Sequence, residues 1–279
     1  MGGTERTILI TGCSSGIGHH LAHALHKRGW RVLATCRKEA DCARLRGEGL
    51  ESFRLDYEDA GSIEAGFAQA MERTGGRLDA LFNNGAYAIP GALEDMPEAA
   101  LRQIFEANFF GWHDLTRRTI PVMRAQGHGR IVMNSSILGL AAIRMRGAYI
   151  ATKYALEGYT DTLRMELDAT PIHVILLEPG PIRTRIRQNA RPHYERWIER
   201  ENSPWARFYK EVLEPRLYAA DPAPDPFELG CEATTRKLIH ALESRRPRAR
   251  YYVTTATYIV GIMRRLLPTR VLDRILLLG

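Results

Sequence analysis

The sequence predicts an α/β protein with a doubly wound parallel sheet of the Rossmann type. Short apolar runs alternate along the chain with segments of helical periodicity, and the first run leads directly into a glycine-rich turn and a helix. Strands that alternate with helices form a parallel sheet with helices on both faces. The length of 279 residues accommodates one large domain or two small ones.

The first strand, expected over residues 7–10, is followed by the glycine-rich turn and by a helix with an apolar face. Strand, turn and helix are the three parts of a dinucleotide-binding unit, in which the phosphates lie on the helix N-terminus. The glycine spacing is G-x-x-x-G-x-G rather than G-x-G-x-x-G. The residues expected to bind a cofactor here are Gly12, Ser14, Ser15, Gly16, Ile17 and Gly18.

The first helix also carries His19 and His23, four residues apart and therefore on one face. Two histidines at this spacing can share a metal ion, but no carboxylate or cysteine lies beside them in the sequence. We therefore expect a histidine pair on a solvated helix face and no metal site.

The second strand follows Gly29 and ends near Cys36 and Arg37. The position that ends this strand lies beside the adenosine ribose, where an acidic residue binds the 2′-hydroxyl of NAD and an arginine pairs with the 2′-phosphate of NADP. Cys36 stands at the position expected for the acid, and Arg37 follows. This pattern predicts NADP(H) in preference to NAD(H). The alternative is a solvent-facing Arg37.

Further buried strands are expected over residues 53–56, 80–82, 131–133, 174–177 and 251–253. Polar residues end several of them, including Asp56, Asn84 and Gly85. Asn108 lies inside an apolar helical patch, so its amide is either paired in the core or directed at the site.

Tyr149 and Lys153 are four residues apart, which places both side chains on one face of a helix. A cation near a phenol favours the phenolate and lowers the pKa of the tyrosine, so the pair can transfer protons. Ser136 follows the strand at 131–133, where ligands bind in open α/β sheets. By itself the Tyr-x-x-x-Lys spacing also fits an exposed pair.

The strand at 174–177 is followed by a rigid turn that borders the same crevice, with Pro179, Gly180, Ile182 and Thr184. Thr184 is a candidate ligand of the nicotinamide amide or an ordinary loop residue. Residues 185–228 lose the regular alternation and contain several aromatic side chains. We expect this irregular segment to form the lid and wall of the substrate site, with ordinary surface packing as the alternative.

The formal charge of +7 is concentrated near the C-terminus, where ten Lys or Arg from Arg236 onward face only Glu243 and Asp273, a net +8. Residues 254–279 form an amphipathic extension with apolar residues at helical spacing. This extension could lie on a membrane surface, or it could cover the protein's own core or a dimer interface. No nucleic-acid-binding motif accompanies the basic residues, and we expect no nucleic-acid partner.

The four cysteines, Cys13, Cys36, Cys42 and Cys231, lack CxxC pairs and metal-ligand spacing, so we expect reduced thiols. No signal peptide pattern precedes the first strand, and no apolar run reaches membrane-spanning length. These features predict a cytoplasmic protein.

Several spaced motifs together resemble the short-chain dehydrogenase/reductase family over about two-thirds of the chain. The motifs are Thr11-Gly-x-x-x-Gly-Ile-Gly18, Asn83-Asn84-Gly85, Asn108, Ser136 and Tyr149-x-x-x-Lys153. One departure is that family members usually have Asn-Asn-Ala-Gly after the fourth strand, whereas this chain has glycine and alanine exchanged at Gly85 and Ala86.

The resemblance implies a single Rossmann-type domain over residues 1–279, hydride transfer between nicotinamide and a carbonyl or alcohol, and a homo-oligomer. It implies that Tyr149 is the acid/base, that Lys153 lowers the tyrosine pKa and holds the nicotinamide ribose, and that Ser136 binds the substrate oxygen. Asn108 is implied to support a water path to Lys153. The resemblance also places Asp56 at the adenine, Asn84 on the adenosine side and Thr184 at the nicotinamide amide.

The glycine-rich turn and the residues near Cys36 look most similar to the branch that acts on hydroxysteroids and retinoids. The expected function is therefore NADP(H)-dependent interconversion of a ketone or aldehyde and an alcohol, on a bulky hydrophobic substrate. The alternative is a catalytically idle NADP-binding sensor or scaffold.

Overall fold

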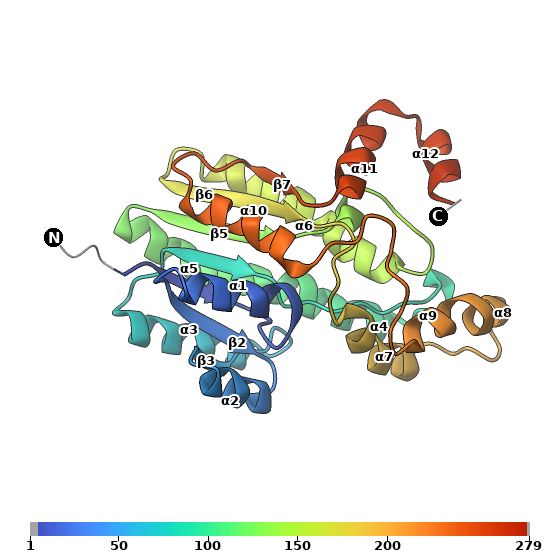
Figure 1. Ribbon diagram of the computed structural model, residues 1–279, viewed down its shortest axis with the longest axis horizontal. Coiled ribbons are helices and arrows are strands. Elements are labelled where there is room, and N and C mark those ends of the chain that lie inside the picture. Colours follow the sequence, from blue (N-terminus) through green and yellow to red (C-terminus); the bar gives the residue numbers. More distant parts are fainter. Residues whose placement is uncertain (1–4, 278–279) are drawn as a thin grey trace.

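The computed structural model describes residues 5–277 of the chain. Residues 1–4 and the last two residues of the expected C-terminal extension lie outside the described part. A seven-stranded, fully parallel sheet with strand order β3-β2-β1-β4-β5-β6-β7 forms the centre of the fold (Figure 1). The strands are β1 (Thr7–Ile10), β2 (Arg31–Cys36), β3 (Glu51–Arg54), β4 (Ala80–Asn83), β5 (Gly129–Asn134), β6 (Ile172–Glu178) and β7 (Arg250–Tyr252).

The predicted doubly wound α/β fold is confirmed, because helices cover both faces of this sheet. Neighbouring residues of β1 alternate between the faces: Ile8 and Ile10 join one core cluster, and Leu9 joins the other. The first face is covered by α1 (Gly16–His26), α2 (Glu39–Gly47) and α10 (Cys231–Glu243). The second is covered by α3 (Ala60–Thr74), α5 (Gly111–Gln126) and α6 (Gly147–Glu166).

The strand order reverses direction between β1 and β4, so the connections leave the sheet on opposite sides at this point. Open α/β sheets bind ligands in the crevice at such a switch point, outside the carboxyl ends of the strands. The elements that carry the predicted site residues all reach this edge, which faces right in Figure 1.

The segment 185–228 is largely helical, which corrects the expectation that it is irregular. It forms α7 (Ile186–Trp197), α8 (Ala206–Phe208), the π-helical turn η4 (Tyr209–Leu213) and α9 (Glu214–Tyr218). Ala190 and Tyr194 lie one helical turn apart and are both fully buried in a third core cluster, together with Tyr209. The aromatic residues of this segment therefore belong to helices that pack on a core cluster shared with Ala148 and Tyr149 of α6.

The C-terminal extension forms two helices, α11 (Thr255–Leu266) and α12 (Thr269–Leu276), which project from the molecule beyond β7 (Figure 1). Pro268 separates them, as the helical periodicity on either side of it predicts. Within residues 5–277, no helix has the length and apolar character needed to cross a membrane. The four cysteines are free thiols, as predicted.

Candidate active site

The glycine-rich turn connects β1 to α1 at the switch point. Gly12 has a φ of +68°, and a Cβ placed there would lie 2.5 Å from the Cα of Gly85 at the end of β4. A Cβ on Gly18 would lie 2.6 Å from the Gly12 carbonyl oxygen. Only glycine fits these two positions, because the turn lies directly against the neighbouring strand end and against its own helix.

The amide of Asn84 fastens this turn to the centre of the sheet. Its Nδ2 donates to the carbonyl oxygens of Thr11 at 2.9 Å and Gly12 at 3.2 Å, and its Oδ1 accepts from Asn134 Nδ2 at 2.8 Å. Gly85 makes the close contact with Gly12, and its carbonyl oxygen accepts from Trp112 Nε1 at 2.9 Å. The side chain of Asn84 thus holds the glycine-rich turn in place, and Gly85 fits tightly against this turn.

Helix α1 begins at Gly16 with Ser15 as its N-cap residue, and its first turn contains no acidic side chain. Unpaired N–H groups and the helix dipole at such an end favour a phosphate group. Ile17 packs on the core, and the Ser14 carbonyl oxygen accepts from Arg44 Nη2 at 2.7 Å. The turn and helix therefore fit the pyrophosphate of a dinucleotide.

At the end of β2, Cys36 is fully buried and Arg37 is exposed. The backbone carbonyl of Arg37 accepts from Arg54 Nε at 3.2 Å, and Arg54 Nη2 lies 3.3 Å from Asp56 Oδ2. Asp56 also accepts from the backbone N–H of Glu58 through Oδ1 at 3.2 Å. Arg37 and Asp56 therefore lie near one another at the edge where the adenosine is expected.

Ser136 follows β5 and caps the short helix η3 (Ile137–Gly139), where its Oγ accepts from Leu138 N–H at 3.1 Å. The neighbouring Ser136 hydroxyl lowers the pKa of the Tyr149 phenol, near the start of α6, so the two side chains lie close together. Both side chains are buried. The two hydroxyl groups are brought together although they lie thirteen positions apart in the sequence.

Burial raises the pKa of Tyr149 to about 12, although the hydrogen bond from Ser136 and the charge of Arg146 lower it. The expected lowering of this pKa by Lys153 is therefore wrong for the protein alone. The largest cause is the burial of the phenol itself, and burial also lowers the pKa of Lys153, to about 7.

Lys153 lies one turn after Tyr149, with its Nζ 5.4 Å from the centre of the tyrosine ring. The same Nζ donates to the Asn134 carbonyl oxygen at 2.7 Å and lies 4.5 Å from the centre of the Trp112 ring. Glu157, one turn further along α6, raises the pKa of Lys153 but less than burial lowers it. The amine is thus held in a fixed, dry position beside the phenol.

Asn108 lies in a π-helical turn, η2 (Glu106–Phe110), between α4 (Glu98–Phe105) and α5. Its amide is fully buried and pairs with the backbone of Tyr87, accepting at 3.1 Å and donating at 2.9 Å. Nδ2 also lies 3.4 Å from Thr152 Oγ1 on the active-site helix. Asn108 is thus paired in the core immediately behind the tyrosine and lysine.

The turn after β6 closes the crevice on the side opposite β2. Pro179 accepts from Ile137 N–H at 2.8 Å, which joins this turn to the segment after Ser136. Gly180 packs against Thr254, and Ile182 pairs with Leu229. Thr184 lies beside Gly16, since a Cβ on that glycine would be 3.2 Å from the Thr184 Cβ. A bound dinucleotide would therefore lie between the glycine-rich turn and the turn that follows β6.

Three side chains near the site were not identified from the sequence. Trp112 and Arg146 flank Lys153 and Tyr149 respectively, and Glu48 hydrogen-bonds both His19 and His23. No carboxylate lies beside the histidine pair in the sequence, and the fold brings Glu48 to it from the end of α2. None of the three belongs to a local motif, so only the fold brings them to these places.

Comparisons with known proteins agree with this geometry. A family model described as short chain dehydrogenase matches residues 6–195. The chain is 42% identical to "Uncharacterized oxidoreductase YbbO" of Escherichia coli over 98% of its own length and 94% of that protein. It is 36% identical to human retinol dehydrogenase 8, over 66% of this chain and 61% of that protein. A short-chain dehydrogenase structure from Streptomyces avermitilis superposes with a TM-score of 0.77 at 27% identity, covering 98% of this chain and 94% of the other.

Proposed function

Because the chain belongs to the short-chain dehydrogenase family of oxidoreductases, we propose that it interconverts a ketone or aldehyde and the corresponding alcohol with NADP(H). The observation that carries this proposal is the buried pair of hydroxyl groups of Ser136 and Tyr149, with Lys153 one turn away. An oxidoreductase that reduces a carbonyl must supply a proton at the position where the alkoxide forms, and this pair offers two hydroxyl groups there.

A bound nicotinamide cofactor would supply the hydride. The protein's own part in reduction is to protonate the developing alkoxide from Tyr149 Oη while Ser136 Oγ hydrogen-bonds the same oxygen. A pKa of about 12 keeps Tyr149 protonated at neutral pH, as a proton donor must be. The buried position of both residues excludes water and strengthens these interactions.

The preference for NADP(H) rests on the end of β2. Cys36 is buried and cannot bind a ribose hydroxyl as a carboxylate does, whereas the exposed guanidinium of Arg37 is free to approach a 2′-phosphate. The fit of the glycine turn to a dinucleotide applies equally to both cofactors. The choice between them therefore depends on Arg37.

The proposed substrate is bulky and apolar, in the manner of a steroid or retinoid. The helices α7 and α9 and the turn η4 pack on an apolar cluster that includes Tyr149 and Met145, so the wall nearest the catalytic tyrosine is hydrophobic. The similarity to a protein named retinol dehydrogenase 8 supports the same substrate class.

The alternative proposal is an NADP-binding sensor or scaffold without turnover. It is less well supported, because a binding protein has no use for a buried proton donor beside a serine hydroxyl. NADPH oxidation by the purified protein should be measured with a panel of apolar ketones and aldehydes, in parallel with NADH. Turnover that falls at least about 100-fold in Tyr149→Phe, with NADPH binding retained, supports the enzyme. Binding without turnover across the panel supports the sensor.

We also propose that the exposed apolar face of α11 and α12 contacts an anionic membrane surface. Ile262 and Leu266 are 57% and 74% exposed, so these residues do not cover the core of the same chain. Exposed Arg265, Arg270 and Arg274 flank them. Apolar side chains beside arginines bind anionic lipid surfaces through both burial and charge.

The resemblance to the family supports a further proposal, that the chain associates into a homo-oligomer. Soluble oligomers of this kind are usually closed and symmetric. Light scattering on the purified protein distinguishes a monomer from a dimer or tetramer.

A further inference from the structure

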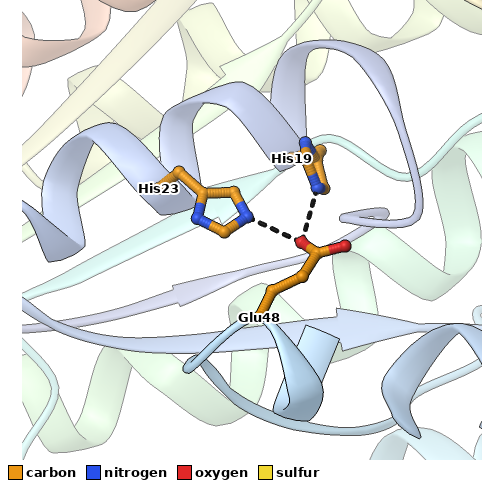
Figure 2. A group of neighbouring side chains, drawn as sticks. All are labelled: His19, His23 and Glu48. Atoms are coloured by element: carbon orange, nitrogen blue, oxygen red, sulfur yellow. Dashed lines mark hydrogen bonds and ion pairs between the residues drawn. The ribbon is translucent and has the colours of Figure 1, made fainter. Parts of the chain in front are cut away.

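His19 and His23 of α1 form a compact group with Glu48, which follows α2, on the surface of the protein (Figure 2). The Nε2 atoms of both imidazoles lie 2.8 Å from the same oxygen, Oε2 of Glu48. The two rings meet edge to face with their centres 4.6 Å apart. Three side chains thus direct one potential ligand atom each at a common point.

We propose that His19, His23 and Glu48 form a zinc-binding site that fastens the end of α2 to α1. Two histidines and one glutamate are a ligand set that zinc uses in proteins, with water in the fourth position. All three side chains are about 30% exposed, which gives water access to the metal. Imidazole and carboxylate ligands together favour zinc over magnesium or calcium.

The scaffold holds these ligands in place without a metal. His19 and His23 are one turn apart on α1, and Glu48 directly follows the last residue of α2, where its backbone N–H hydrogen-bonds the Arg44 carbonyl oxygen. Both helices pack on the same core cluster, through Leu21 and Leu45 among others. The distance between the two ligand-bearing backbones is therefore set by the fold.

Only a small adjustment is needed to admit the ion. Tetrahedral zinc with bonds of about 2.0 Å keeps its ligand atoms about 3.3 Å apart, so the 2.8 Å contacts must open by about half an ångström. Each imidazole then binds through the Nε2 lone pair and keeps its proton on Nδ1. Rotation of the exposed glutamate side chain is sufficient to make this room.

The charges around the group are compatible with a monodentate glutamate. Arg44 contacts Oε1 of Glu48, the oxygen that does not face the histidines, and also donates to the Ser14 carbonyl. Asp41 lies 3.9 Å from the same arginine and offsets its charge.

Zinc binding should be measured by calorimetry and by competition with a chromophoric chelator, using untagged, metal-stripped protein, because a histidine tag would itself bind zinc. We expect one zinc ion per chain. At a zinc concentration 100-fold above Kd, the melting temperature should rise by roughly 5 °C. If no zinc binds at 100 μM, the dissociation constant is weaker than about 100 μM and the proposal is overturned.

Variants identify the ligands. His23→Ala and Glu48→Gln should each weaken zinc binding at least about 10-fold. Glu48→Gln keeps the size and shape of the side chain, so it still tests the site if His23→Ala folds poorly. His26→Ala is the matched control, since His26 lies at the end of the same helix outside the group. Zinc binding that is unchanged in the first two variants, or equally weakened in His26→Ala, would contradict the assignment.

Discussion

The side-chain nitrogen of Lys153 lies 4.5 Å from the centre of the Trp112 indole ring, in a pocket where the lysine is 1% exposed. An ammonium group gains some energy from the face of an indole, but it loses far more on leaving water. Burial accordingly lowers the pKa of Lys153 from 10.5 to about 7. Burial of Lys153 therefore lowers the stability of the folded protein, while it places an amine beside Tyr149.

This cost predicts that Lys153→Met stabilises the protein at acidic pH. Between pH 7 and 10.5 the unfolded chain binds a proton on Lys153 that the folded chain does not. The free energy of unfolding of the wild type therefore rises with pH through this window, by up to about 1.4 kcal/mol per pH unit from this group. Urea unfolding at pH 6 should show the variant to be more stable, with the difference narrowing toward pH 10.

The exposed Lys210 provides the matched control. Lys210→Met should leave the dependence of stability on pH unchanged. If the difference between Lys153→Met and the wild type is the same at pH 6 and pH 10, Lys153 is charged in the folded protein at both pH values and the lowered pKa is wrong.

The choice of cofactor should depend on the guanidinium of Arg37. Arg37→Ala is expected to raise the KM for NADPH about 10- to 100-fold and to leave the KM for NADH nearly unchanged, because a charge-assisted hydrogen bond contributes about 1.5–3 kcal/mol. Steady-state kinetics with both cofactors measures this. Arg102→Ala, on the exposed face of α4 and paired with Glu98, should change neither value. Equal weakening of both cofactors by Arg37→Ala would show that Arg37 does not contact the 2′-phosphate.

Arg250 on β7 is expected to be the most important single charge for stability. Its Nη1 lies 2.6 Å from Glu178 Oε1 and 2.5 Å from Glu157 Oε2, and its Nη2 lies 2.6 Å from Asp161 Oδ2. Burial, with the nearby charge of Glu157, raises the pKa of Glu178, and Arg250 opposes this rise. Arg250→Ala leaves three carboxylates without their common partner and should lower the free energy of unfolding by about 3–5 kcal/mol.

Chemical denaturation at pH 7 measures that loss. The exposed Arg246 lies in the loop before the same strand, and Arg246→Ala should change the free energy of unfolding by less than about 0.5 kcal/mol. A similar small effect for Arg250→Ala would mean that the carboxylates are protonated or solvated and do not need the arginine.

The strands and the main helices could be predicted from the sequence because their signals are local. The apolar run at residues 7–10, for example, is β1 without any shift. β3 begins at Glu51, two residues earlier than expected, because its ladder is set by pairing with Leu33 and Cys36 of β2. The local apolar pattern of the sequence thus predicts that a strand exists, and pairing with the neighbouring strand determines where it begins and ends.

Two of the features that were missed depend on the tertiary fold. Glu48 reaches His19 across 29 positions. The pKa of Tyr149 follows from burial, which a spacing of four residues does not reveal. The helices of segment 185–228 were obscured by Pro192 within α7 and by the many charges, although Ala190 and Tyr194 have helical spacing. Gly12, Asn84 and Ser136 were predictable because each follows a strand end, and Tyr149 and Lys153 because they are one helical turn apart.

The last prediction concerns α11 and α12. If their apolar face meets an anionic membrane, the double substitution Ile262→Asp and Leu266→Asp should reduce binding to vesicles that contain phosphatidylserine, because each aspartate removes apolar area and is repelled by the lipid charge. Vesicle flotation at low and high salt measures the bound fraction. Met165→Asp, at a residue 72% exposed on α6, is the control and should bind as the wild type does. A wild-type protein that stays free of vesicles, but whose dimer dissociates in the double variant, would instead show that this face joins two copies of the chain.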